Sequence, residues 1–255
     1  MSDHEREQLA EGTLISHLME LRQRMLRALI SVLVLFVPCV IFQNELFTLL
    51  ALPLIERLPQ GAQMIATSPV APVMVPLKLA FFAALFLAMP YVLYQAWAFV
   101  APGLYRNEKR FAIPLVISSI VLFYAGAAFA YFVVFPLMFA FLASTTPDGV
   151  LMMTDIGSYL NFVLLLFFAF GVAFEIPIAT VLLAATGLVR IETLTKNRGY
   201  VVLGIFVVAA FLTPPDAISQ SFMAVPMYLL YEIGIVLSRL LIGRRAQRSE
   251  EREAT

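Results

Sequence analysis

Three glutamates lie where a carboxylate could do chemistry. Glu20 and Glu108 each sit among arginines and lysines, beside apolar runs, and Glu175 lies inside another apolar run. A carboxylate in such a setting binds cations, and a guanidinium group can form two parallel hydrogen bonds with it. An ionisable group within a membrane span is costly, so Glu175 is also a candidate functional residue.

Each carboxylate also has an ordinary structural interpretation. Glu20 can form an ion pair with Arg24 one helical turn further on, and Glu108 can neutralise the two cations that follow it. Glu175 can hydrogen-bond to a neighbouring helix. The charge pattern alone leaves both interpretations open for all three residues.

Enzyme chemistry has few residues to draw on. The chain has two histidines and a single cysteine, and no phosphate-binding loop or spaced set of metal ligands is recognisable. We therefore expect no enzyme activity, no cofactor and no metal, and any energy for transport must come from elsewhere, such as the proton-motive force. Cys39 lies in an apolar run and is interpreted as a small buried hydrophobic residue.

Composition indicates that lipid surrounds much of the chain. Hydrophobic residues make up 61% of the sequence and charged residues 13%, whereas a soluble domain carries roughly 25% charged residues. The formal net charge is zero, which argues against nucleic acid as a partner because phosphate binding needs a basic surface. These features predict an all-α integral membrane protein in which a single membrane domain covers residues 1–255.

Six apolar segments are predicted to span the membrane. The fourth is long and holds Pro177 as a kink site, and prolines in the other spans favour bent helices that form a concave scaffold. The fifth span is short, and the sixth, interrupted at Glu232, is predicted to be short as well, unless part of 190–198 extends the fifth helix. The tail 239–255 is predicted to be disordered. The predicted spans are 26–42, 79–100, 111–135, 156–186, 200–212 and 217–237.

The placement of basic residues predicts the orientation of these spans. Of the 17 lysines and arginines, only Arg57 and Lys78 fall in the segments between the first and second, third and fourth, or fifth and sixth spans. Basic residues accumulate on the cytoplasmic side of a membrane. Both termini are therefore expected in the cytoplasm, and Glu20 and Glu108 are expected at the same membrane surface.

Four segments together resemble one family. They are residues 17–24 (HLMELRQR), 97–105 with 108–110 (WAFVAPGLY and EKR), 170–177 (FGVAFEIP) and 212–216 (LTPPD). In this order, over nearly the whole chain, they are similar to the TatC family, the signal-recognising subunit of the twin-arginine protein translocase.

The resemblance implies a receptor role for the cytoplasmic carboxylates. By analogy, Glu20 and Glu108 would receive the two guanidinium groups of a twin-arginine signal peptide, with Phe99 and Arg22 beside them. The chain would then act in the bacterial cytoplasmic (inner) membrane, recognise folded cargo and take part in export driven by the proton-motive force.

The resemblance also implies partner subunits. Thr213, Asp216 and Gln220 would lie near a docking surface for the single-span subunits TatA and TatB, and the chain would form homo-oligomers within the complex. Ordinary intraprotein hydrogen bonds are an equally good interpretation of Thr213 and Gln220, and Asp216 is expected to cap the turn. The alternatives for the whole protein are a proton-coupled transporter of small solutes, against which the absence of a recognisable internal repeat argues, and a membrane scaffold without cargo.

Overall fold

The chain is built from helices, as the composition predicts. The computed structural model describes residues 3–55, 64–104, 112–145, 153–213 and 216–253. Within these ranges the one extended pairing is an isolated parallel bridge between Ile65 and Asp155. The prediction of an all-α fold is confirmed.

Five apolar stretches of the described chain are long enough to cross a bilayer. They lie in helix α1 (Asp3–Ile41), α3 (Ala71–Leu104), the continuous run α4 (Ala112–Phe129), η2 (Ala130–Val134) and α5 (Phe135–Ser144), the pair α6 (Ile156–Ala173) and α7 (Ile176–Ala185), and α10 (Ala217–Glu253). The remaining helices are α2 (Gln43–Ile55), α8 (Ile191–Lys196) and α9 (Arg198–Leu212).

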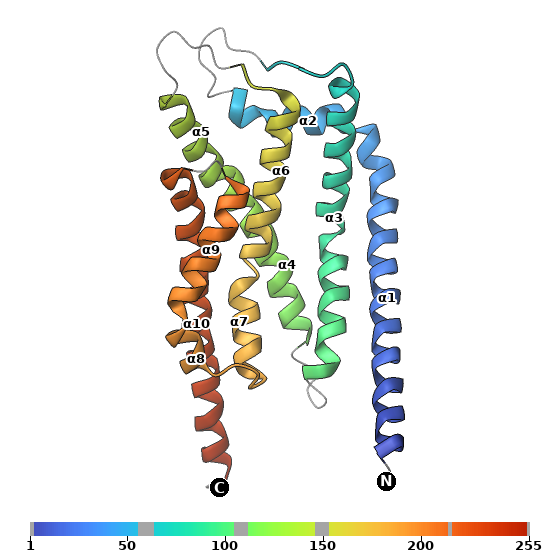
Figure 1. Ribbon diagram of the computed structural model, residues 1–255, viewed down its shortest axis with the longest axis vertical. Helices are drawn as coiled ribbons and strands as arrows, with labels where there is room; N and C mark the ends of the chain where they lie inside the picture. The colour runs from blue at the N-terminus through green and yellow to red at the C-terminus, as the bar shows by residue number, and fades with distance from the viewer. Residues whose placement is uncertain (1–2, 56–63, 105–111, 146–152, 214–215, 254–255) are drawn as a thin grey trace. The chain divides into compact units, whose positions relative to one another are not determined.

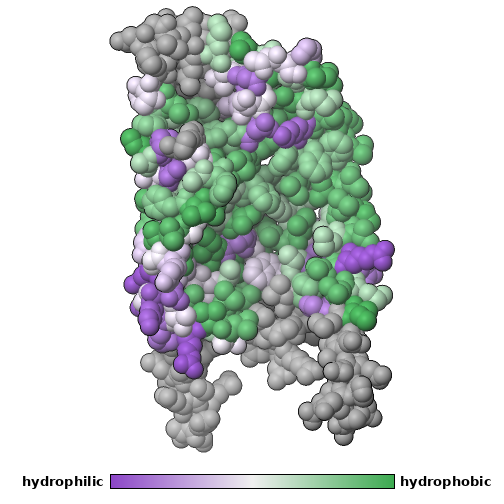
Figure 2. All heavy atoms as spheres, viewed as in Figure 1, coloured by the Kyte–Doolittle hydropathy of each residue, from purple (hydrophilic) through white to green (hydrophobic). Residues whose placement is uncertain are grey.

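Apolar side chains lie on the exposed surfaces of these helices as well as in the interfaces between them. Phe132 is 72% exposed and Phe211 is 84% exposed, which would be unfavourable in water. Figure 2 shows apolar residues over most of the described face. Such a surface fits a hydrocarbon solvent, so the expectation of a multi-pass membrane protein is supported.

The helices fall into two packed groups, Met1–Phe47 with Pro76–Ile120 and Thr48–Val75 with Val121–Thr255. In the first group α1 packs against α3 through Val32 and Cys39, which meet three alanines of α3. These alanines are spaced four residues apart, and small residues at this spacing let two helices approach closely. They are Ala80, Ala84 and Ala88. Cys39 is a buried core residue, as predicted.

In the second group glycines permit the close approach of helices. A Cβ atom at Gly126 of α4 would collide with the backbone carbonyl of Phe170 in α6. A Cβ atom at Gly234 of α10 would lie 2.9 Å from Cβ of Thr180 in α7. Helix α10 also packs along α9.

The fourth predicted span is broken next to Pro177, as expected. Helix α6 ends at Ala173 and α7 starts at Ile176, so the proline lies in the first turn of α7, where it costs no hydrogen bond. Figure 1 shows the break between α6 and α7. The five-residue π-helical segment η2 was not predicted.

The helix at the fifth predicted span is short, but the helix at the sixth is not. Helix α9 has 15 residues, and the segment before it forms the separate helix α8 instead of extending α9. The prediction of a short sixth span is wrong, since the apolar part of α10 covers Ala217–Leu241, or 25 residues, without interruption at Glu232. The charge of Glu232 is balanced by Arg198, so the apolar helix can continue past it.

The tail also differs from its prediction. Residues 239–255 were expected to be disordered, whereas α10 continues to Glu253. The arginine, glutamine, glutamate and alanine residues of this segment are good helix formers, and they extend a helix that is already nucleated by packing. The concave scaffold and the single membrane domain stay predictions.

Candidate functional site

Helices α1 and α3 bring together two of the residues predicted to bind a signal peptide. His17, Glu20 and Arg24 are spaced three and four residues apart and therefore share one face of α1. The side chains of His17 and Arg24 contact Phe99 and Gln95, which lie one turn apart on α3. We call this group of five residues the α1–α3 site.

The carboxylate of Glu20 is paired with Arg24. The Arg24 Nη2 and Nε atoms both donate to Oε1 of Glu20, at 2.6 and 2.9 Å. The Glu20 side chain remains 38% exposed and that of Arg24 21% exposed. The ordinary interpretation of Glu20, an i,i+4 ion pair, is thus realised, and the carboxylate remains accessible from outside.

Arg24 also connects the two helices. Its Nη1 donates to Oε1 of Gln95 at 3.3 Å. Gln95 is only 4% exposed, and a buried amide needs hydrogen-bond partners. The guanidinium therefore joins a buried amide of α3 to a partly exposed carboxylate of α1.

A second contact between the two helices is aromatic. His17 lies one turn from Glu20 on α1, and Phe99 lies one turn from Gln95 on α3. The rings of His17 and Phe99 are stacked, with 4.3 Å between their centroids and 20° between their planes. Stacking of this kind holds Phe99 in a defined orientation against His17, which lies one helical turn from Glu20 on α1.

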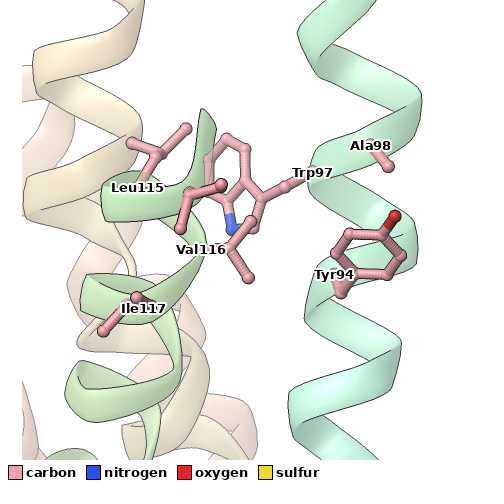
Figure 3. Close-up of a pocket in the computed structure, with 7 residues that line it drawn as sticks. Tyr94, Trp97, Ala98, Leu115, Val116 and Ile117 are labelled. Atoms are coloured by element: carbon pink, nitrogen blue, oxygen red, sulfur yellow. The ribbon is translucent and has the colours of Figure 1, made fainter. Parts of the chain in front are cut away.

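A small apolar pocket lies between α3 and α4. It holds about 290 Å³ and is lined almost entirely by carbon. Trp97 reaches across it, as Figure 3 shows, and the indole Nε1–H donates to Oγ of the buried Ser119 at 2.8 Å. The polar atom of Trp97 is thereby satisfied, and the exposed part of the pocket is hydrophobic. The lining residues are Tyr94, Trp97, Ala98, Ile113, Leu115, Val116 and Ile117.

Glu108 and Arg22 are the two other residues predicted to bind the signal peptide. Glu108 lies outside the described residues, so its position relative to Glu20 stays a prediction. Arg22 is exposed on α1. Because it lies two residues from both Glu20 and Arg24, it points to another face of the helix.

Glu175 lies at the break in the fourth span. It precedes α7 directly as the N-cap residue, and its carbonyl accepts from the N–H of Ala179 at 2.9 Å. Its side chain is half-buried and does not cap the helix. The structure therefore places this carboxylate at a helix end inside an apolar stretch long enough to cross a membrane, where backbone groups are not all used within the helix.

Two of the three predicted docking residues, Thr213 and Asp216, make ordinary side-chain hydrogen bonds. Thr213 is buried, and its hydroxyl donates to the carbonyl of Ala209 at 2.9 Å. Asp216 caps α10, as expected, because its Oδ1 accepts from the N–H of Ser219 at 2.7 Å. That hydrogen bond lowers the pKa of Asp216 below its usual value. Gln220 lies half-buried in the first turn of α10.

One charged cluster was missed by the sequence reasoning. Arg198 Nη2 donates to Oε2 of Glu232 at 2.7 Å, and the Tyr228 hydroxyl donates to Oε1 at 2.8 Å. Nearby, the Tyr231 hydroxyl donates to the carbonyl of Leu194 at 2.8 Å. From the sequence alone, Glu232 was treated only as an interruption of an apolar run. An acid within one apolar segment and an arginine at the end of the preceding apolar segment could have indicated the Arg198–Glu232 ion pair.

Asp155 is a second charged residue whose role was not predicted from the sequence. Its Oδ1 accepts from the N–H and hydroxyl of Thr67, at 3.1 and 2.8 Å, and its Oδ2 accepts from the N–H of Ser158 at 2.8 Å. These hydrogen bonds, that from Ser158 first, lower the pKa of Asp155 to about 2. The carboxylate thus caps α6 and ties it to the segment before α3.

Comparison with known proteins gives a consistent result. Residues 16–226 match the family described as Sec-independent protein translocase protein (TatC). The chain is 54% identical over 237 residues to the protein of that name from Escherichia coli O6:H1 (strain CFT073), covering 93% of this chain and 92% of the relative. It is also 54% identical over 242 residues to the protein of that name from Azotobacter chroococcum mcd 1, covering 95% and 93%.

A solved structure shares the fold. A crystal structure described as the twin arginine translocase receptor TatC superposes with a TM-score of 0.80 at 38% identity. The superposition covers 88% of this chain and 98% of that one.

Proposed function

Because the chain belongs to the TatC family of Sec-independent protein translocase proteins, we propose that it binds twin-arginine signal peptides through the α1–α3 site. Glu20 and Glu108 each receive one guanidinium, and Phe99 lies beside the bound arginines. The family assignment gives no support to the alternative of a small-solute transporter.

One observation supports this proposal above the others. The sequence places Glu20 and Phe99 far apart in the chain, yet α1 and α3 bring their surroundings together through the His17–Phe99 stack and the Arg24–Gln95 hydrogen bond. A partly exposed carboxylate beside an aromatic ring suits a guanidinium, which pairs with the acid and stacks on the ring. The apolar pocket between α3 and α4 can accept a hydrophobic side chain of the same peptide.

We further propose that α9 is a sixth span and that both termini lie in the cytoplasm, in the bacterial inner membrane. Fifteen residues of helix reach about 22 Å, which is less than the usual hydrocarbon thickness. The membrane around α9 is then thinner than average, or partner subunits cover its ends. Lopsided placement of basic residues supports the orientation.

The region around α9 and α10 is the proposed contact for TatA and TatB. Thr213, Asp216 and Gln220 lie close together in the chain where these two helices meet, and α9 exposes apolar residues such as Phe211 to the membrane. Polar side chains at such a junction can bond to a helix of another subunit. We also propose that the side chain of Glu175 provides a polar contact inside the membrane for the transported protein or a partner subunit.

Cross-linking tests the receptor role. A twin-arginine signal peptide with a photoreactive residue beside the arginine pair should cross-link to this protein, and Glu20→Gln should reduce the yield severalfold. Glu192→Gln is the matched control, since Glu192 is an exposed glutamate on the proposed cytoplasmic side. An undiminished yield with Glu20→Gln would exclude Glu20 from the site.

A further inference from the structure

The acid proposed to receive a signal arginine already holds an arginine of its own chain. We infer that Arg24 occupies the place that the signal guanidinium takes, so that peptide binding is an exchange of one guanidinium for another at Glu20. This inference rests on the proposed function and adds to it the step by which the site opens.

The geometry of the pair requires such an exchange. Both Arg24 donors, Nη2 at 2.6 Å and Nε at 2.9 Å, use the same oxygen, Oε1 of Glu20. An incoming guanidinium forms its two parallel hydrogen bonds only when both carboxylate oxygens are available. With Arg24 in place, a peptide can reach Oε2 alone, so the two-bond contact forms only after Arg24 leaves.

The displaced side chain has another partner. Arg24 Nη1 already donates to Gln95, whose amide is 4% exposed and fixed within α3. When the bonds to Glu20 break, Arg24 keeps this contact and turns its remaining donors toward water, to which it is 21% open. Departure therefore does not bury an unpaired charge, the event that makes the breaking of ion pairs expensive.

Breaking the Arg24–Glu20 pair costs little free energy, and the cost applies to every peptide that binds both carboxylate oxygens of Glu20. A partly exposed i,i+4 ion pair changes an equilibrium constant by about 1.4-fold to 5-fold. Arg24 therefore lowers the affinity of the empty site by that factor. Between binding events it keeps the Glu20 charge neutralised.

Peptide affinity measured on the full-length protein in detergent tests the inference. Arg24→Gln should bind a twin-arginine signal peptide about 1.4 to 5 times more tightly than the wild type. Arg27→Gln removes the same charge one turn away, from an exposed position, and should produce a smaller change. Combining Arg24→Gln with Glu20→Gln should abolish the gain, because no carboxylate remains to be released.

The outcomes separate the inference from the function on which it rests. If Glu20→Gln binds the peptide like the wild type, the proposed function fails. If Glu20→Gln weakens binding while Arg24→Gln binds no better than Arg27→Gln, only the exchange is wrong. If Arg24→Gln binds the peptide more weakly than the wild type, the exchange is also wrong, and Arg24 instead positions the carboxylate of Glu20. Should Arg24→Gln not fold, Arg24→Lys keeps the charge with a single-point contact; tighter binding by this variant supports the exchange, and equal or weaker binding overturns it.

Discussion

Arg198, the first residue of α9, forms an ion pair with Glu232, in the apolar part of α10, with 2.7 Å between Nε and Oε1. Both side chains are partly shielded, and a hydrogen bond from Tyr228 fixes the carboxylate further. The pair fastens the short helix α9 to the long helix α10 near one end. It also explains how α10 carries an acid in the middle of an apolar run.

Breaking this pair should destabilise the protein. Glu232→Leu removes the partner of a partly buried guanidinium and should cost about 1–3 kcal/mol in the free energy of unfolding. Thermal unfolding in detergent should show a lowered midpoint. The double variant with Arg198→Leu should recover part of the loss, because no unpaired charge remains. Equal midpoints for Glu232→Leu and the wild type would show that the pair contributes nothing.

Asp155 makes stability depend on pH in the acid range. Its pKa of about 2 in the folded protein lies below the ordinary value of 3.8, so the folded state favours the charged form. The resulting stabilisation is complete above about pH 4 and is lost as the pH falls toward 2. Unfolding midpoints of the wild type should therefore fall across this window more steeply than those of Asp155→Asn. Parallel curves for the two proteins would contradict the assignment.

The contact between α4 and α6 depends on Gly126. Gly126→Ala places a methyl group against the carbonyl of Phe170 and should cost about 1–3 kcal/mol in the free energy of unfolding. Gly204→Ala is the matched control, since a Cβ atom there meets open space within α9 and should leave stability unchanged or raise it slightly. A Gly126→Ala protein as stable as the control would mean that the helices can separate freely.

Much of the helical architecture was visible in the sequence, because span length and hydropathy are local properties. The short α9 and the break at Pro177 follow from residues within a few positions of each feature. The uninterrupted α10 could not be predicted in this way, since Glu232 is tolerated through Arg198, 34 residues earlier in the chain. The same holds for η2, whose backbone conformation has no recognised local signature.

The candidate site was predictable to a similar extent. The Glu20–Arg24 pair follows from i,i+4 spacing on one helix and was expected as one of two interpretations. The link from Arg24 to Gln95 and the stacking of His17 on Phe99 depend on how α1 packs against α3, for which spacing gives no information. The alanines of α3 that set this packing would have been the signal to examine.

Labelling from outside the membrane tests the orientation. With Cys39 replaced by alanine, single cysteines can be introduced at Ser68 and Glu192, both of which are exposed. A membrane-impermeant maleimide added to spheroplasts should modify the cysteine at 68 and spare that at 192 until the membrane is permeabilised. Modification of both positions in intact spheroplasts would rule out the proposed topology.

The receptor role is tested most directly by comparing two peptides on two proteins. The affinity of a twin-arginine signal peptide and of its twin-lysine counterpart should be measured for purified wild type and Glu20→Gln by a method such as fluorescence anisotropy. We predict that the wild type prefers the arginine peptide and that Glu20→Gln loses affinity for it and most of the preference. An unchanged preference in Glu20→Gln would show that arginines are recognised elsewhere.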